Sequence, residues 1–426
     1  MGIITQERAK SSVFLLLSTV ILLLVLFSAL AIASFPLKMQ SSSRIVLQGP
    51  AGTALAPLHL AGKQEVIYEE QDGIYAVPSS GGRPRALFTP GYIYNRAVPA
   101  QLKPTGELLY SGNGIWQANI FTGQAMKIAS LPANGVITSL VLSSDWSLLA
   151  WSSAPADGKG TLTLYAGPPA ATVPVYQRAA DRCPCFRIFA SLPATGKAAH
   201  PTLLLTDDHG DHEAVQHGLW TLPLNSAADT KPRQLFASDP PQGPLALSPA
   251  THALLYATTE EYVPTPDSAV PGDISGLSYA NDLAIATLTG EPAHLVSPTG
   301  ILPEQPQLSD SPTKRWVTTP LFSPDGRTLA YVAFSSDVTR PFERHSTLYS
   351  VGVNSTGSQI HVDQPQLLAL AQAHYVELGG WLDGRTLLIY ADNALYALDI
   401  QHGALATIVQ TGTYARVVAV VQRGQS

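Results

Sequence analysis

The stretch PLFSPDGRTLAYVAF, residues Pro320 to Phe334, decides the fold of this chain. Pro324 fixes φ near the value that the second position of a type I turn needs. Asp325 tolerates the third position and can bond its own backbone, and Gly326 supplies the positive φ that closes a hairpin with a bulge. Thr328 to Phe334 is almost continuously apolar, which predicts a strand that is covered on both faces. We therefore expect a tight hairpin that leads into a buried strand.

The same corner returns along the chain, each time ahead of an apolar run. A short apolar strand before a Gly-containing turn follows each corner, as in 73–77 and 218–222, and a fourth strand often ends in Leu-Phe or Leu-Val. Four short strands that repeat at intervals of roughly 40–75 residues are typical of propeller blades. The copies of the corner lie near residues 62, 105, 145, 196, 250, 325 and 383.

The repeat predicts an all-β chain that folds as a β-propeller of seven four-stranded blades. Six or eight blades are alternatives, and a sandwich of unrelated hairpins is a further one. A propeller must bury its last sheet edge. Either Ala415–Val421, a strand after the last blade, or Arg44–Leu47, a strand before the first, is expected to complete a shared blade.

The corner, together with the runs LAYVAF and TLYSVGV, resembles the TolB-type or PD40 repeat of WD40-like β-propellers. The resemblance covers about residues 60–410 and is most specific from Pro320 to Val353. It implies a propeller fold. TolB proteins are also implied to have a small α/β domain before the propeller, and this chain has an apolar segment and a short linker there instead.

The composition excludes one class of partner. The chain has 426 residues, of which 45% are hydrophobic and 13% are charged, and its net charge is −6. The 33 Gly and 34 Pro favour an all-β chain over a helical one. No basic block is present to neutralise phosphates, so we expect no binding of nucleic acid.

The N-terminal segment Ser12–Ser34 carries no charged residue and is apolar. About 20 apolar residues cross a bilayer, and Arg8 and Lys10 before the segment favour a cytoplasmic N-terminus. We expect a single-pass membrane protein with the propeller outside the cytoplasm; secretion after cleavage near Ala31–Ala33 is the alternative. The expected organisation is a short cytoplasmic tail over 1–11, a transmembrane signal-anchor helix over 12–34, a linker over 35–43 and the propeller over 44–424.

The two cysteines, Cys183 and Cys185, are two residues apart. A disulfide between them needs a cramped loop and is expected to be strained. A CxC pair without a second pair of Cys or His nearby is a weak metal signal. Two loop thiols and one local disulfide both stay open.

Function is expected where the connections between second and third strands are long. These connections open on one face of a propeller, and they are long in blades three to six, around 154–160, 207–217, 259–281 and 335–345. Long loops on a rigid scaffold usually carry binding. The candidate binding residues are Asp207, Asp208, His209, Asp211, His212, Glu260, Glu261 and Tyr262.

Metal binding is a weaker interpretation of the same loops. Carboxylates and imidazoles at the density of 207–217 can hold a divalent metal. However, Asp207, His209, Asp211 and His212 fit no fixed ligand spacing, so a solvated hairpin tip is favoured. We expect no metal site and no cofactor.

The sequence favours a non-catalytic module that binds a protein, peptide or glycan of the cell envelope. The alternative is a hydrolase or lactonase-like propeller enzyme with a metal in its axial channel, which needs acidic or His side chains on several innermost strands. The predicted innermost strands carry almost no acid; Glu377 and His374 are the exceptions. No Gly-x-Ser-x-Gly elbow and no phosphate loop occurs.

Overall fold

The computed structural model divides the chain into two units, Met1–Ile45 and Val46–Ser426. All residues that the structure describes lie in the second unit. The described residues are 47–95, 98–103, 105–181, 184–194, 200–207, 217–224, 231–237, 245–249, 253–262, 279–289, 294–300, 313–337, 340–356, 359–371 and 376–422.

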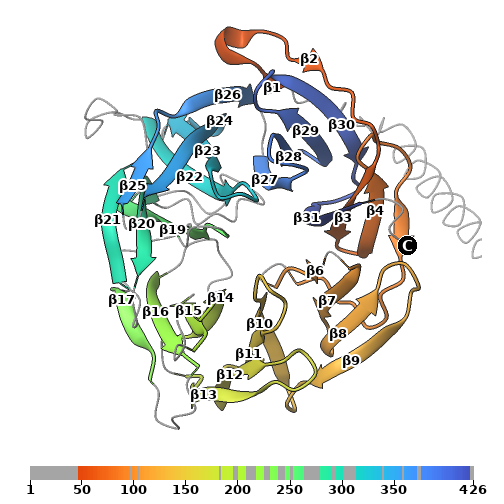
Figure 1. Ribbon diagram of the computed structural model, residues 1–426, viewed down its shortest axis with the longest axis vertical. Helices are drawn as coiled ribbons and strands as arrows, with labels where there is room; N and C mark the ends of the chain where they lie inside the picture. The colour runs from red at the N-terminus through yellow and green to blue at the C-terminus, as the bar shows by residue number, and fades with distance from the viewer. Residues whose placement is uncertain are drawn as a thin grey trace, which may run out of the picture. The chain divides into compact units, whose positions relative to one another are not determined.

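The described residues form seven sheets around a common centre, as Figure 1 shows, and the four antiparallel strands of each sheet are one blade of a β-propeller. The prediction of seven four-stranded blades is confirmed. Within each blade, the strands follow one another from the innermost to the outermost. The strands are, for blade 1, β31 (Arg416–Gln422), β3 (Gln64–Glu70), β4 (Gly73–Pro78) and β5 (Arg85–Leu87); for blade 2, β6 (Gln101–Leu102), β7 (Glu107–Ser111), β8 (Gly114–Asn119) and β9 (Ala125–Ser130); for blade 3, β10 (Gly135–Leu142), β11 (Leu149–Pro155), β12 (Thr161–Gly167) and β13 (Val173–Ala179); for blade 4, β14 (Phe186–Leu192), β15 (Thr202–Asp207), β16 (His217–Pro223) and β17 (Arg233–Phe236); for blade 5, β18 (Leu245–Leu247), β19 (Ala253–Tyr262), β20 (Tyr279–Thr289) and β21 (His294–Gly300); for blade 6, β22 (Thr313–Phe322), β23 (Thr328–Asp337), β24 (Arg340–Thr356) and β26 (Gln366–Ala371); and for blade 7, β27 (Val376–Trp381), β28 (Thr386–Ala391), β29 (Ala394–Asp399) and β30 (Ala404–Gln410).

The quoted corner is a hairpin turn between β22 and β23, as predicted. Gly326 donates its N–H to the Ser323 carbonyl at 2.8 Å and has a φ of +67°. The Ser323 hydroxyl donates to Asp325 at 2.6 Å and accepts the N–H of Thr328 at 2.9 Å. Ser323 is fully buried, so its side chain fixes the corner from inside the blade.

Blade 3 repeats this bonding with different residues. The Ser143 hydroxyl donates to Asp145 at 2.5 Å and accepts the N–H of Leu148 at 2.9 Å. Trp146 takes the place of Gly326, with a φ of +63°. Sequence comparison of the two corners therefore aligns residues that have the same structural role.

The closing strand of the ring comes from the C-terminus. β31 pairs antiparallel with β3, with Glu69 opposite Arg416 and Gln64 opposite Gln422. Of the two expected ways to complete a blade, the strand within Ala415–Val421 is the one observed. The predicted corner near residue 62 is wrong as a hairpin within a blade, because the innermost strand of blade 1 comes from the other end of the chain.

The segment ahead of β3 covers two outer sheet edges. β1 (Leu47–Gln48) pairs antiparallel with β26 of blade 6, and β2 (Ala56–Pro57) pairs parallel with β30 of blade 7. The 3₁₀-helix η1 (Pro50–Gly52) lies between them in the chain. Leu47, expected as part of a blade-completing strand, instead covers an edge on the outside of the ring (Figure 1). A short strand, β25 (Gln359–Val362), pairs with the end of β24.

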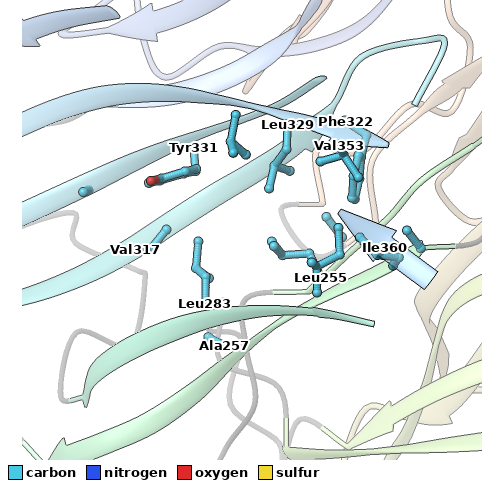
Figure 2. Packing of buried hydrophobic residues seen from close by; sticks show 14 residues of the cluster. Leu255, Ala257, Leu283, Val317, Phe322, Leu329, Tyr331, Val353 and Ile360 are labelled. Carbon is cyan, nitrogen blue, oxygen red and sulfur yellow. The ribbon is translucent and has the colours of Figure 1, made fainter. Parts of the chain in front are cut away.

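Neighbouring blades pack through apolar side chains on both faces of their sheets. Every residue of β15 and of β28 is buried, as expected for strands covered on both sides. Figure 2 shows the cluster between blades 5 and 6, where Leu255 and Leu283 of blade 5 lie near Val317 and Tyr331 of blade 6. This packing sets the positions of the innermost strands.

Four blades repeat an aromatic pair that crosses from the second to the third strand. In each pair the two residues are directly opposite in the ladder, where side chains are close enough to stack. The ring centroids are 3.8 to 6.4 Å apart and the planes are 6° to 23° from parallel. The pairs are Tyr68 with Tyr75, Tyr110 with Trp116, Trp151 with Tyr165, and Tyr331 with Tyr349.

Candidate functional site

The two ends of the ring differ in the connections that they carry. The corners between first and second strands lie on one end, which we call the corner face. The turns between second and third strands, and the crossings from one blade to the next, lie on the opposite end, which we call the mouth face. In blades 1, 2 and 7 the second-to-third turns are tight, at Gln71–Asp72, Gly112–Asn113 and Asp392–Asn393, as predicted.

The structure places the predicted binding residues in different settings. Asp207 is the last residue of β15, is 1% exposed, and accepts the backbone N–H of Cys185 at 2.8 Å. It therefore holds the entry to blade 4 in place. Asp208, His209, Asp211 and His212 lie outside the described residues, as do Cys183 and His374.

Two of the expected long loops are shorter than the sequence suggested. Glu260, Glu261 and Tyr262 belong to the strand β19, where Glu261 pairs with Ala280 and Tyr262 with Tyr279, so their assignment to a loop is wrong. The loop expected over 335–345 is also wrong, because Ser335 to Asp337 pair with Arg340 to His345 as a continuation of the hairpin of β23 and β24.

A polar cluster at the mouth face was missed by the sequence analysis. It lies where blade 7 meets blade 1 and blade 2, and we call it the seam cluster. Its members come from the strands β3, β27 and β31 and from two crossings between blades. They are Glu69, Tyr92, Tyr94, Asn95, Glu377, Tyr414 and Arg416.

Glu69 is the centre of the seam cluster and is only 1% exposed. Its carboxylate accepts the Nε of Arg416 at 2.6 Å, the hydroxyl of Tyr92 at 2.9 Å and the backbone N–H of Ala100 at 3.4 Å. Arg416 Nη2 donates to the carbonyl of Asn95 at 3.0 Å, and its guanidinium lies 5.7 Å from the ring centre of Tyr94. A buried carboxylate with this many donors is fixed in one orientation.

Burial and the Glu69 carboxylate shift the pKa of Arg416 in opposite directions. Burial lowers the pKa of the Arg416 guanidinium, but the charge and hydrogen bond of Glu69, together with Tyr414 and Tyr94, outweigh burial, so this pKa is raised above its usual value. Burial and the same carboxylate both raise the pKa of the Tyr92 hydroxyl, which keeps it protonated and donating.

Glu377 lies on the innermost strand of blade 7, at the mouth. Its carboxylate accepts the hydroxyl of Tyr414 at 2.7 Å, and burial together with Glu377 raises the pKa of that hydroxyl. The Tyr414 ring packs edge-on against Tyr390 at 5.1 Å. Of the two exceptions on the predicted innermost strands, Glu377 is thus a described carboxylate on an innermost strand, and it is bonded to Tyr414.

Glu70, next to Glu69, holds the crossing that leads into the closing strand. Its carboxylate accepts the Thr413 hydroxyl at 3.3 Å. Burial and the nearby charge of Asp72 raise the pKa of Glu70, against the lowering effect of donors from Gly412 and Thr413. The crossing over 411–415 is therefore tied to carboxylates of two blades, Glu70 of blade 1 and Glu377 of blade 7.

The described residues contain no group of three or more His, Cys, Asp or Glu side chains placed to hold a metal ion. Among the same residues, none lies in a helix that is long and apolar enough to span a bilayer. The apolar segment over 12–34 is outside this part of the chain.

Comparison with known proteins shows likeness in structure but not in sequence. No protein-family model matches the chain, and no curated protein matches it. A periplasmic gluconolactonase from Pseudomonas aeruginosa is 13% identical over 84% of this chain and 98% of its own, with a TM-score of 0.45. A putative 6-phosphogluconolactonase from Bacteroides uniformis is 11% identical over 84% of this chain and 99% of its own, with a TM-score of 0.47.

A putative TolB from Agrobacterium tumefaciens is 12% identical over 73% of this chain and 91% of its own, with a TM-score of 0.37. At these identities the likeness concerns the fold alone, and the number of blades rests on the strand order of this chain. The chain folds as a seven-bladed β-propeller, and its repeat at Pro320–Val353 resembles that of the TolB-type, PD40 propeller proteins.

Proposed function

We propose that the chain is a membrane-anchored propeller that acts outside the cytoplasm and binds a protein, peptide or glycan through its mouth face. One observation carries the proposal. The connections after β11, β15 and β19, which are 156–160, 208–216 and 263–278 in the chain, all leave from the mouth face, where the seam cluster also lies. Binding surfaces are commonly formed by long connections and fixed polar groups on one face of a rigid scaffold.

The anchoring part of the proposal is supported by the uncharged segment Ser12–Ser34 and by the basic residues before it. In intact cells, an external protease is expected to remove the propeller and leave the N-terminal tail. Release of the full propeller into the medium would instead support cleavage and secretion.

Capture of a partner tests the binding function. The tagged full-length chain is crosslinked in its native membrane and purified beside three variants. The first has the connections 208–216 and 263–278 shortened, and the second is Glu377→Gln with Tyr414→Phe. The matched control is Glu107→Gln, which removes a carboxylate near a blade 2 corner, where it pairs with Lys103 at 2.8 Å.

We expect one set of partners to be captured by the native chain and the Glu107 control, and to be lost or reduced with the shortened variant. Equal capture by all four proteins would contradict binding through the mouth face.

A second candidate, an enzyme with an axial metal, is favoured by one observation. Glu377 is on the innermost strand of blade 7, within the cluster that holds Tyr414 and Arg416. Metal analysis of the purified full chain tests it. A stoichiometric metal that is lost in Glu377→Gln would favour the enzyme, and a metal content equal to the buffer's would remove it.

A further inference from the structure

A pocket lies on blade 2, at the end of the blade that carries its corner. Its volume is about 440 Å³, within the range of sites that take small molecules. The strands β7, β8 and β9, which lie side by side in Figure 1, form it together with the turn from β8 to β9. Its lining includes Glu107, Gln117, Ala118, Asn119, Gln124 and Met126. Glu107 directly follows the corner, so the pocket is at the end of the ring away from the mouth face.

The strand ladder brings the polar side chains of this pocket to one face of the sheet. Asn119 is directly opposite Glu107 of β7, and Gln117 is opposite Met126 of β9. Residues that are opposite in a ladder share a face, and so do residues two apart in one strand. The Asn119 N–H donates to the Gln124 carbonyl at 2.8 Å, which holds the residue before β9 at the end of the same row.

Three side-chain amides, those of Gln117, Asn119 and Gln124, give the site its name, the amide pocket. In the part of the chain that the structure describes, the side chains of Gln117 and Gln124 make no hydrogen bond, although Gln117 is half-buried. The Asn119 side-chain oxygen accepts the N–H of Phe121 at 2.9 Å and that of Thr122 at 3.0 Å. These bonds fix the Asn119 amide and leave its NH₂ group for a ligand.

The amide pocket carries no unbalanced charge. Among the lining residues, all of which the structure describes, Glu107 alone is charged, and the Lys103 ammonium pairs with its carboxylate at 2.8 Å. A charged ligand would therefore meet no opposite charge that is not already paired. Glu107 borders the pocket, and the groups that we expect to bind are the three amides. Half-buried amides without a protein partner gain hydrogen bonds when a ligand supplies them.

We propose that the amide pocket binds a neutral saccharide. An amide offers a donor and an acceptor, and a sugar hydroxyl can bond to either. Ala118 and the exposed Met126 thioether stem add apolar surface beside the amides, on which the C–H groups of a sugar ring can pack. An extended peptide fits less well, because the pocket is on the face of the sheet, whereas backbone pairing needs a sheet edge. This site goes beyond the proposed function, which concerns the other end of the ring.

Oligosaccharides test the site on the full-length chain, held in a detergent whose head group is not a sugar. The neutral probes are oligomers of glucose, mannose, galactose and N-acetylglucosamine, and the charged probes are oligomers of glucuronic acid and of glucosamine. Titration calorimetry measures their binding. The site variant is Gln117→Met with Gln124→Met, which keeps the side-chain volume and removes the hydrogen-bonding groups. The matched control is Gln366→Met with Gln401→Met, two exposed amides on blades 6 and 7.

We expect at least one neutral oligomer to bind, and the charged oligomers to bind more weakly. The site variant is expected to weaken binding by about 5- to 100-fold, the effect of losing two neutral hydrogen-bonding groups. The control is expected to bind as the native chain does. Equal thermal unfolding of the two variants shows that any difference in binding is local.

The inference would be overturned by no binding of any neutral oligomer, by equal binding of neutral and charged oligomers, or by a site variant that binds as well as the control. The variant with 208–216 and 263–278 shortened keeps the two proposals apart. It is expected to bind the saccharide as the native chain does. Saccharide binding that this variant loses and the site variant keeps would support binding at the mouth face and refute the amide pocket.

Discussion

Replacing Arg416 with Met is expected to open the ring at its closing strand. The variant leaves the Glu69 carboxylate 1% exposed but without the guanidinium whose Nε is 2.6 Å away in the native chain. Breaking a buried pair by removing one partner costs about 3–5 kcal/mol. Each 1.4 kcal/mol is about tenfold in an equilibrium, so opening of β31 is expected to become roughly 100- to 3,000-fold more frequent.

Native-state hydrogen exchange of the backbone amides within Val417–Val421 that point toward β3 measures this opening, because β31 pairs with β3 alone and alternate amides of the strand take part in that ladder. The matched control is Arg85→Met. Arg85 pairs with Glu65 near the other end of β3 at 3.3 Å, but its side chain is 53% exposed. An exposed pair of this kind contributes about 0–1 kcal/mol, so the control is expected to change exchange by less than about tenfold.

The double variant Glu69→Gln with Arg416→Met tests the cause. The amide oxygen can keep the bond from the Ala100 N–H, and the amide NH2 in place of the other carboxylate oxygen can donate to the Tyr92 hydroxyl. No buried charge would remain, so most of the protection is expected to return. The reasoning would be refuted if Arg416→Met exchanged no faster than Arg85→Met, or if the double variant were as unprotected as the single one.

Three further predictions concern stability. In a thermal unfolding assay, Gly326→Ala is expected to destabilise the propeller by about 1 kcal/mol, because φ is +67° at that residue. The control is Gly384→Ala, at a corner where φ is not positive and where no atom lies within 4 Å of the added Cβ. We expect it to leave the stability unchanged. Burial and Asp72 raise the pKa of the Glu70 carboxyl above its usual 4.5, so its ionisation costs more in the folded than in the unfolded chain. Glu70→Gln should therefore be more stable than the native chain at neutral pH, and the difference should vanish as the pH falls below 4.5; a constant difference across this pH range would contradict the assigned cause. Trp151→Ala removes a buried, stacked ring and is expected to cost about 3–5 kcal/mol in denaturant unfolding, and a cost below about 1 kcal/mol would show that the cross-strand stack does not stabilise the blade.

The architecture could be predicted because each blade repeats a local signal. The corner at Ser323–Arg327 needs Asp325 and Gly326 at fixed offsets, and the buried second strand needs an unbroken apolar run. Both requirements act within about ten residues of each other, the range over which sequence patterns report directly on structure. The number of blades followed from counting these signals.

The extent of the loops could not be predicted in the same way. The stretch over 335–345 lies between the apolar runs 328–334 and 346–350, so the sequence predicts a connection there. In the structure the hairpin of β23 and β24 continues through it, because backbone pairing propagates from an established ladder whatever the side chains. Glu260 and Glu261 were assigned to a loop for the same reason.

The seam cluster was beyond the reach of sequence patterns for a different reason. Glu69 and Arg416 are 347 residues apart; Glu69 is one of three glutamates in β3, and Arg416 is the single charged residue of β31. Neither has a neighbour at a spacing that indicates a partner. Only the closure of the ring brings them together.

The closing strand makes blade 1 depend on both ends of the chain. Among the described strands, β3 is synthesised early and β31 comes after all the others, so the first blade stays without its innermost strand until translation has reached Gln422. A product that stops early would expose the ladder edge of β3 and leave the Glu69 carboxylate without Arg416. Such an edge and a buried unpaired charge are features that proteases and chaperones encounter in incomplete chains. The ring thereby links its own stability to the completeness of the polypeptide.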